Sequence, residues 1–218
     1  MELDQIEAYL QSQDSQERLK AITELKQYDA EIVVPLLIGK MRDSEFLVRS
    51  FVAMGLGRKQ TADSFAALLE MIKFDRDPNV RAEAANSLSL FGEIAASHLM
   101  LAFNQDDHWL VRRSILAGLI ELNCPEELFE VCACGIQGED PTVHEASIEG
   151  FGLLAGTAKQ GIALEELLSL IKVEQWRTRM QVAKALGKFD NPQAKEALIQ
   201  LQQDEDHRVA GSALEGLI

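Results

Sequence analysis

The sequence is poor in several residue classes, and each shortage excludes a class of protein. Proline occurs five times and glycine fourteen times in 218 residues, which excludes collagen-like and proline-rich chains. No apolar run reaches the ~18 to 20 residues that a membrane-spanning helix needs, so we expect no membrane insertion. The first residues carry no basic segment followed by an apolar stretch, and we therefore expect no signal peptide and a cytoplasmic location.

Basic residues are also scarce. Lys and Arg total 21 against 35 Asp and Glu, which gives a formal net charge of −14. Proteins that bind nucleic acids need a positive face to displace the counterions of the phosphates, and this sequence has no cluster of four or more basic residues. We expect no nucleic-acid ligand, and a basic or neutral protein partner instead.

The sequence has only three cysteines, Cys124, Cys132 and Cys134. An odd number argues against a disulfide framework and suits a reducing compartment. On a helix, Cys132 and Cys134 point about 200° apart, and Cys124 lies roughly 12 Å from Cys132 along the axis. Because this geometry does not suit a shared zinc ion, we expect buried structural cysteines and no metal site.

The most prominent feature of the sequence is an internal repeat. A Val-Arg signature preceded by an acidic residue returns along the chain, and its basic positions are 18, 49, 81, 112, 144, 179 and 208. His144 takes the place of arginine in the fifth unit. Successive basic positions are roughly 30 residues apart, and a nearly constant period of this length is typical of solenoid proteins.

Each unit carries the local signals of two helices joined by turns. Asp77-Pro78 and Asp140-Pro141 combine an N-cap residue with a helix-start proline. A second helix follows, with start signals at residues 61–64 and at Asn191-Pro192. Strand signals are absent. The prediction is an all-α, right-handed α-solenoid of about six to seven helix pairs. We expect one domain over residues 1–218, with a short capping segment at 1–14, repeats from about residue 15 and an incomplete last repeat at 204–218.

The pattern Asp-Pro-x-Val-Arg…Ala…Leu-Gly, returning at this period, resembles the HEAT-repeat family over about residues 15–216. More narrowly, it is similar to the short HEAT-like repeats of phycobilin lyases, cyanobacterial proteins that service the phycobilisome antenna. The resemblance implies a link to phycobilisome assembly, maintenance or turnover, with a phycobiliprotein or another phycobilisome component as partner. No catalytic motif of that family can be placed on this sequence residue by residue.

Two functions remain open at this point. The first is a non-catalytic scaffold or adaptor that binds a partner protein and needs no cofactor. The alternative is a subunit of a phycobilin lyase, which would hold a phycocyanobilin-type open-chain tetrapyrrole and attach it to, or detach it from, an antenna protein. The sequence has no nucleophile-elbow motif and no Gly-rich phosphate loop, so no catalytic residue is predicted. Alkyl-DNA glycosylases built from HEAT-like repeats form a third class, against which the net charge argues.

The candidate partner-binding residues are Phe46, Trp109 and Trp176, which occupy the proline position of their repeats. Tryptophan is enriched among the residues that dominate binding energy at interfaces, so the three are candidate anchors on one edge. The alternative is that each ring packs onto the neighbouring unit. The recurring arginines similarly predict either an anion-binding strip or, with nearby acids, structural ion pairs between repeats.

The last repeat contributes a further expectation about partners. Its segment ends in Leu214, Leu217 and Ile218, which would leave apolar surface at the C-terminal end. Terminal repeats of solenoids need a polar outer face. We therefore expect this end to take part in self-association or in partner binding.

Overall fold

The computed structural model describes all of residues 1–218, and every regular element in it is a helix. Fourteen α-helices alternate along the chain as first and second helices of six consecutive pairs, with α1 before them and α14 after them. The helices form the all-α solenoid that the repeats predict. Their bounds are α1 Leu3–Leu10, α2 Ser15–Glu24, α3 Ala30–Ile38, α4 Phe46–Lys59, α5 Ala62–Phe74, α6 Pro78–Ser89, α7 Ala96–Gln105, α8 Trp109–Glu121, α9 Pro125–Gly135, α10 Pro141–Leu153, α11 Gln160–Ser169, α12 Trp176–Leu186, α13 Pro192–Leu201 and α14 His207–Glu215, with short 3-10 turns at Leu25–Gln27 and Gly92–Ala95.

The helix starts follow the predicted capping signals. The side chain of Asp77 accepts a hydrogen bond from the N–H of Asn79, and Pro78 is the first residue of α6. Asn191 caps α13 in the same way, again followed by a proline. Thr61 forms a capping box with Ser64 at the start of α5. Each such cap typically stabilises its helix by about 1 kcal/mol. The caps therefore help to fix where each helix of the repeat begins.

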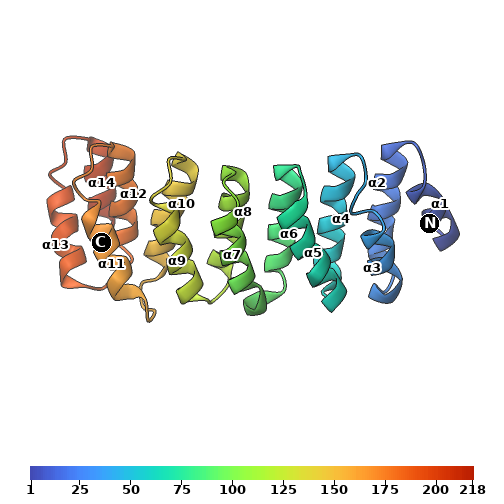
Figure 1. Ribbon diagram of the computed structural model, residues 1–218. Helices are drawn as coiled ribbons and strands as arrows, with labels where there is room; N and C mark the ends of the chain where they lie inside the picture. The colour runs from blue at the N-terminus through green and yellow to red at the C-terminus, as the bar shows by residue number, and fades with distance from the viewer. The chain divides into compact units, whose positions relative to one another are not determined.

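The chain divides into two compact units, Met1–Gly118 and Leu119–Ile218. In unit 1, the first helices α2, α4 and α6 lie in sequence, each backed by its second helix (Figure 1). Val48, Val52 and Leu56 of α4 are fully buried and form part of the core between these layers. The helices approach closely at Gly57, where an added Cβ would lie 2.7 Å from the Cβ of Ser87.

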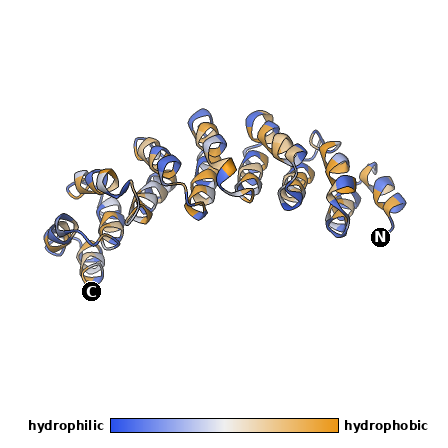
Figure 2. Ribbon diagram, turned by 90° about the horizontal axis from the view of Figure 1, so that it is seen from below, coloured by the Kyte–Doolittle hydropathy of each residue, from blue (hydrophilic) through white to orange (hydrophobic).

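Unit 2 has the same arrangement in α10 to α14. The first helices α10, α12 and α14 contact one another in that order, and α11 and α13 pack behind them. Just after the C-terminal ends of α12 and α14 the backbones approach closely, since a Cβ on Gly187 would lie 2.8 Å from the Cα of Gly216. The helices of both units carry apolar and polar residues side by side, as amphipathic helices do (Figure 2). None of the chain's helices combines the length and the apolar character needed to cross a lipid bilayer.

Candidate functional site

The three candidate aromatic residues all lie at the start of a first helix. Phe46, Trp109 and Trp176 are the first residues of α4, α8 and α12. The prolines of the same repeat position, Pro78 and Pro141, begin α6 and α10. The sequence register therefore predicted their place in the fold correctly, and their surroundings distinguish their possible roles.

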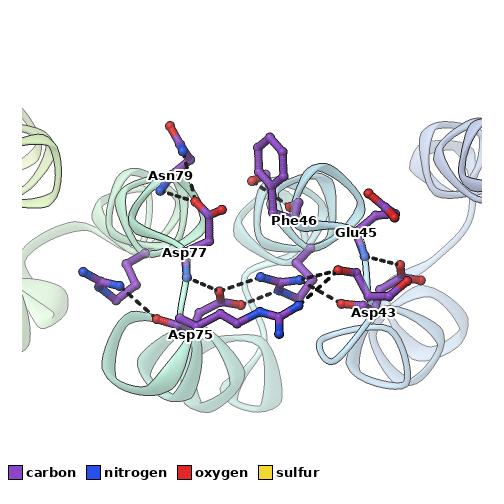
Figure 3. Close-up of polar contacts among 11 residues, drawn as sticks. Asp43, Glu45, Phe46, Asp75, Asp77 and Asn79 are labelled. Carbon is purple, nitrogen blue, oxygen red and sulfur yellow. Dashed lines mark hydrogen bonds and ion pairs between the residues drawn. The ribbon is translucent and has the colours of Figure 1, made fainter.

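The two aromatic residues of unit 1 are open to solvent. The exposed fraction is 44% for Phe46 and 43% for Trp109, and Leu47 beside Phe46 is 43% exposed. The ring of Phe46 points away from the polar network beneath it (Figure 3). Trp109 stacks on His108 with ring centroids 6.0 Å apart. Both rings can therefore be contacted from outside without any rearrangement of the core.

Trp176 of unit 2 lies in a different environment. Its side chain is half-buried, and the guanidinium of Arg208 from α14 stacks 3.2 Å from its ring centroid. Arg208 is held in this place by two hydrogen bonds to Asp206. The guanidinium of Arg177 lies 5.4 Å from the same ring. Trp176 thus joins α12 to α14, whereas the two exposed rings of unit 1 have no such clamp.

Beneath the helix starts, four of the recurring arginines form bridges between successive loops. Arg49 donates from Nε and Nη2 to the two carboxylate oxygens of Asp75, at 2.7 and 2.9 Å. Its Nη1 donates to the carbonyl oxygen of Asp43, six residues earlier, at 2.8 Å. Asp75 also accepts the N–H of Asp77. One guanidinium therefore binds the loop before its own helix and the loop before the next first helix (Figure 3).

We call this arrangement an Arg–Asp bridge, and it recurs in four pairs. In three of them Nε and Nη2 both donate to the carboxylate, whereas in the Arg18–Asp43 pair only Nη2 donates a hydrogen bond. Each bridge joins the arginine of one first helix to an aspartate in the loop before the next first helix. The pairs are Arg18–Asp43, Arg49–Asp75 and Arg81–Asp106 in unit 1 and Arg179–Asp204 in unit 2. Bidentate geometry of this kind gives the strongest hydrogen bonds between side chains.

The hydrogen bonds of the bridges favour the charged forms of both side chains. The hydrogen bond to Asp75 raises the pKa of Arg49 above its ordinary value, and Asp106 does the same for Arg81. The hydrogen bond from Arg179 lowers the pKa of Asp204. The side chains of Arg49 and Asp75 are 5% and 6% exposed. These four arginines are therefore bound by the protein itself and form structural ion pairs between repeats. Arg112 of α8 also donates to the carbonyl oxygen of Asp106, six residues earlier, but the aspartate position of the next loop holds Gly138.

The series is interrupted in unit 2. In α10 the arginine position holds His144, and the aspartate position on the loop before α12 holds Val173. Val173 cannot accept a hydrogen bond through its side chain, so no Arg–Asp bridge can form. A cavity of about 680 Å³ lies here, lined among others by Gly138, Glu139 and His144. The sequence analysis noted His144 but not the loss of the aspartate at position 173, which the period of the repeat could have revealed.

The cysteines and the partly buried carboxylate of Glu83 lie outside the bridges. Cys132 is fully buried, and burial raises the pKa of its thiol far above the usual range. None of the three cysteines forms a disulfide. The structure contains no group of three or more His, Cys, Asp or Glu side chains that could hold a metal ion. Burial also raises the pKa of Glu83, whose carboxylate accepts a long hydrogen bond of 3.5 Å from the hydroxyl of Ser87.

Comparison with known proteins agrees with this architecture. A family model described as HEAT repeats matches residues 35–120 and 131–218. No curated protein matches the chain in sequence. Several solved structures share the fold at low sequence identity.

Three of them illustrate the range. The complex of CpcE and CpcF of phycocyanin lyase from Nostoc sp. PCC7120 matches with a TM-score of 0.55 and 20% identity, over 100% of this chain and 87% of that chain. Mini spindles TOG3 of Drosophila melanogaster matches with a TM-score of 0.60 and 18% identity, over 87% of this chain and 95% of that chain. Kap121p bound to Nup53p matches with a TM-score of 0.62 and 13% identity, over 99% of this chain and 28% of that chain. At these identities the likeness establishes the fold alone.

Proposed function

The chain belongs to the HEAT-repeat family, and from that premise we propose that it is a non-catalytic adaptor that binds a partner protein through the helix starts of unit 1. The observation that carries the proposal is the exposure of Phe46 and Trp109 at equivalent positions of α4 and α8. Proline suits this position for backbone reasons, so a large exposed aromatic there is best explained by a contact outside the chain.

We further propose that the partner is a phycobiliprotein or another component of the phycobilisome and that the encounter takes place in the cytoplasm. The resemblance of the repeats to those of phycobilin lyases supports this choice. The structural likeness to the phycocyanin lyase complex is compatible with it. The net charge of −14 adds a long-range preference for basic or neutral surfaces of such a partner.

The direct test is capture of purified phycocyanin by the immobilised protein, compared with the variant F46A/W109A. We expect the double variant to lose at least about tenfold in affinity, since exposed aromatic anchors typically contribute more than about 1 kcal/mol each. The control variant L90A/I94A removes two other exposed apolar side chains of unit 1, with exposed fractions of 55% and 68%. Equal capture by both double variants would contradict binding through the helix starts.

A phycobilin lyase subunit is the second candidate, and a cavity in unit 1 favours it. The cavity has a volume of about 400 Å³, with apolar walls from Leu69, Ile72 and Leu101 and a basic group from Lys73. Apolar walls with a few polar groups are what a bulky organic ligand needs. Titration with phycocyanobilin tests this function: a shifted absorption band that L101E abolishes would support it, and an unchanged spectrum would contradict it.

Self-association through α14 is a further proposal about partners. Leu214 is 54% exposed and Ile218 is fully exposed. If this surface pairs with a second copy, L214K should shift the protein toward the monomer in sedimentation-velocity experiments. A monomer at every concentration in the unmodified protein would contradict it.

A further inference from the structure

The Arg–Asp bridges show which groups surround a guanidinium between two successive loops. In each bridge the arginine donates to a backbone carbonyl six residues earlier, as Arg179 does to the carbonyl of Val173 at 2.8 Å. The same guanidinium donates to a carboxylate of the following repeat, as Arg179 does to Asp204 at 2.6 and 2.8 Å. The space between two loops is thus built for a guanidinium, and the chain supplies that group itself.

At the interruption in unit 2 the chain supplies neither the guanidinium nor, at Val173, the carboxylate of the bridge. The imidazole of His144 is shorter than an arginine side chain and makes no hydrogen bond to the carbonyl of Gly138 or Glu139, which correspond to the carbonyls that bind the arginines. The cavity of about 680 Å³ reaches these two loop residues and the start of α12. Its size is within the usual range of ligand sites.

The lining of this cavity has the groups that recognise a cation with a planar head. Glu139 and Glu145 contribute carboxylates, and Trp176 and Pro141 contribute apolar walls. Trp176 already stacks against the guanidinium of Arg208, which shows that its ring accepts this partner. Arg177 is the one permanent positive charge of the lining. Burial lowers the pKa of His144, so the imidazole adds no charge at neutral pH.

A cavity beside an intact bridge in unit 1 provides the contrast. It measures about 550 Å³ and is lined by Arg42, Arg49 and Arg76 with an equal number of carboxylates. Its positive charges come from the chain, so a cation gains nothing by entering. At His144, two carboxylates face only one guanidinium.

The surrounding sequence strengthens the attraction for a basic group. Residues 114–158 contain eight Asp and Glu and neither Lys nor Arg. Unit 2 as a whole has 8 Lys and Arg against 17 Asp and Glu, compared with 13 against 18 in unit 1. The long-range field around the cavity therefore favours a positively charged segment.

We propose that the cavity at His144 binds the guanidinium group of an arginine from a basic segment of a partner protein, in the place of the arginine that α10 lacks. The inference deepens the proposed adaptor function, on which it rests, because it names the side chain by which unit 2 recognises the partner. Lysine should bind more weakly, since an ammonium group cannot stack on an aromatic ring as a planar guanidinium does or donate two parallel hydrogen bonds to one carboxylate.

The test uses the full chain and two synthetic peptides. In a W109F background Trp176 is the only tryptophan, so its fluorescence reports on the cavity. A nine-residue Gly/Ser peptide with three arginines and the same peptide with three lysines are titrated at 150 mM salt. We expect the arginine peptide to bind at least about tenfold more tightly. Equal affinity for the two peptides would overturn the proposal and indicate attraction by surface charge only.

Two variants locate the binding. H144R/V173D restores the Arg–Asp bridge, and we expect it to weaken binding of the arginine peptide by at least about tenfold, because the chain then fills the site itself. E139Q/E145Q removes the carboxylates without adding bulk and should give a similar loss. The control E165Q/E166Q changes the net charge by the same amount on α11, outside the lining. Unchanged affinity in E139Q/E145Q would overturn the proposal even if the restored variant failed to fold.

These titrations are separable from the test of the adaptor function. They use no phycobiliprotein, and the reporter is in unit 2, whereas F46A/W109A changes unit 1. Arginine discrimination without phycocyanin capture would overturn the proposed partner and support the site. Capture without arginine discrimination would support the adaptor and overturn the site.

Discussion

Units 1 and 2 are built from the same repeat but use its arginine position differently. Unit 1 carries three consecutive buried bridges, Arg18–Asp43, Arg49–Asp75 and Arg81–Asp106. Unit 2 carries one bridge and one position where neither partner is present. The difference shows that the bridge is not needed at every junction for the helices to stack. Cavities lie beside both kinds of junction, but only the one at His144 has more carboxylates than guanidinium groups in its lining.

The largest expected effect comes from breaking a bridge in unit 1. D75A leaves the guanidinium of Arg49 buried without its carboxylate, which typically costs about 3 to 5 kcal/mol. The measurement is urea unfolding followed by circular dichroism. E70A is the control, since it removes an ion pair whose arginine, Arg42, is 91% exposed, and it should cost less than about 1 kcal/mol. Similar losses in the two variants would show that burial does not govern the strength of these pairs.

The two tryptophans sharpen the comparison. W176A should lower the free energy of unfolding by about 2 kcal/mol, because it removes a half-buried ring clamped by Arg208. W109A should cost less than about 1 kcal/mol, since its ring is exposed. Thermal melts of the two variants side by side decide the point. A larger loss of stability in W109A than in W176A would contradict this prediction and show that the tryptophan of unit 1 is the one that packs.

Restoring the missing bridge should have a smaller and opposite effect. H144R/V173D is expected to raise the free energy of unfolding by about 1 kcal/mol, because a bidentate Arg–Asp pair replaces a histidine and a valine that form no pair. The single variant H144R should be less stable than the double variant because its guanidinium lacks a carboxylate. A double-mutant cycle measures the coupling directly. Additive effects of H144R and V173D would argue that the two positions do not form a pair.

The smallest expected effect is a pH dependence confined to unit 2. Burial lowers the pKa of His144, so the folded protein binds this proton less readily than the unfolded chain. Stability is therefore complete above the ordinary histidine pKa of about 6.5 and falls as the pH drops through the lower folded value. The loss should be less than about 1 kcal/mol because the side chain is only half-buried. H144Q should lose less stability than the parent between pH 7 and pH 5, and identical profiles would contradict this.

Much of the fold could be predicted from local signals. The Asp-Pro and Asn-Pro pairs marked helix starts because capping is decided within a few residues. The period of the basic positions gave the solenoid, since a side chain that recurs once per repeat occupies equivalent places. The structural role of the arginines followed from the same reasoning, although the sequence directed attention to the acid six residues before Arg49, whose backbone carbonyl it binds, rather than to Asp75, whose carboxylate it binds.

The environment of each aromatic residue could not be predicted. Phe46, Trp109 and Trp176 occupy one repeat position, yet only Trp176 meets an arginine from the next first helix. That contact depends on the side-chain conformer in which Arg208 donates a hydrogen bond to Asp206, two residues earlier. The spacing of residues in the sequence does not predict this conformer. The gap at His144 was similarly hidden, because it required comparing position 173 with Asp43, Asp75 and Asp204 rather than looking for a motif.

The two-sided arginine bridge also bears on how such a chain can change in length. The repeats that begin at α4 and α6 each bring an aspartate for the arginine before them and an arginine for the aspartate after them, namely Asp43 with Arg49 and Asp75 with Arg81. Duplication or loss of one whole repeat in this series therefore leaves every bridge around it complete. The same event at His144 or Val173 would place a histidine opposite an aspartate or a valine opposite an arginine. These two repeats are thus interchangeable modules, whereas the junction in unit 2 ties its two repeats to each other as a fixed pair.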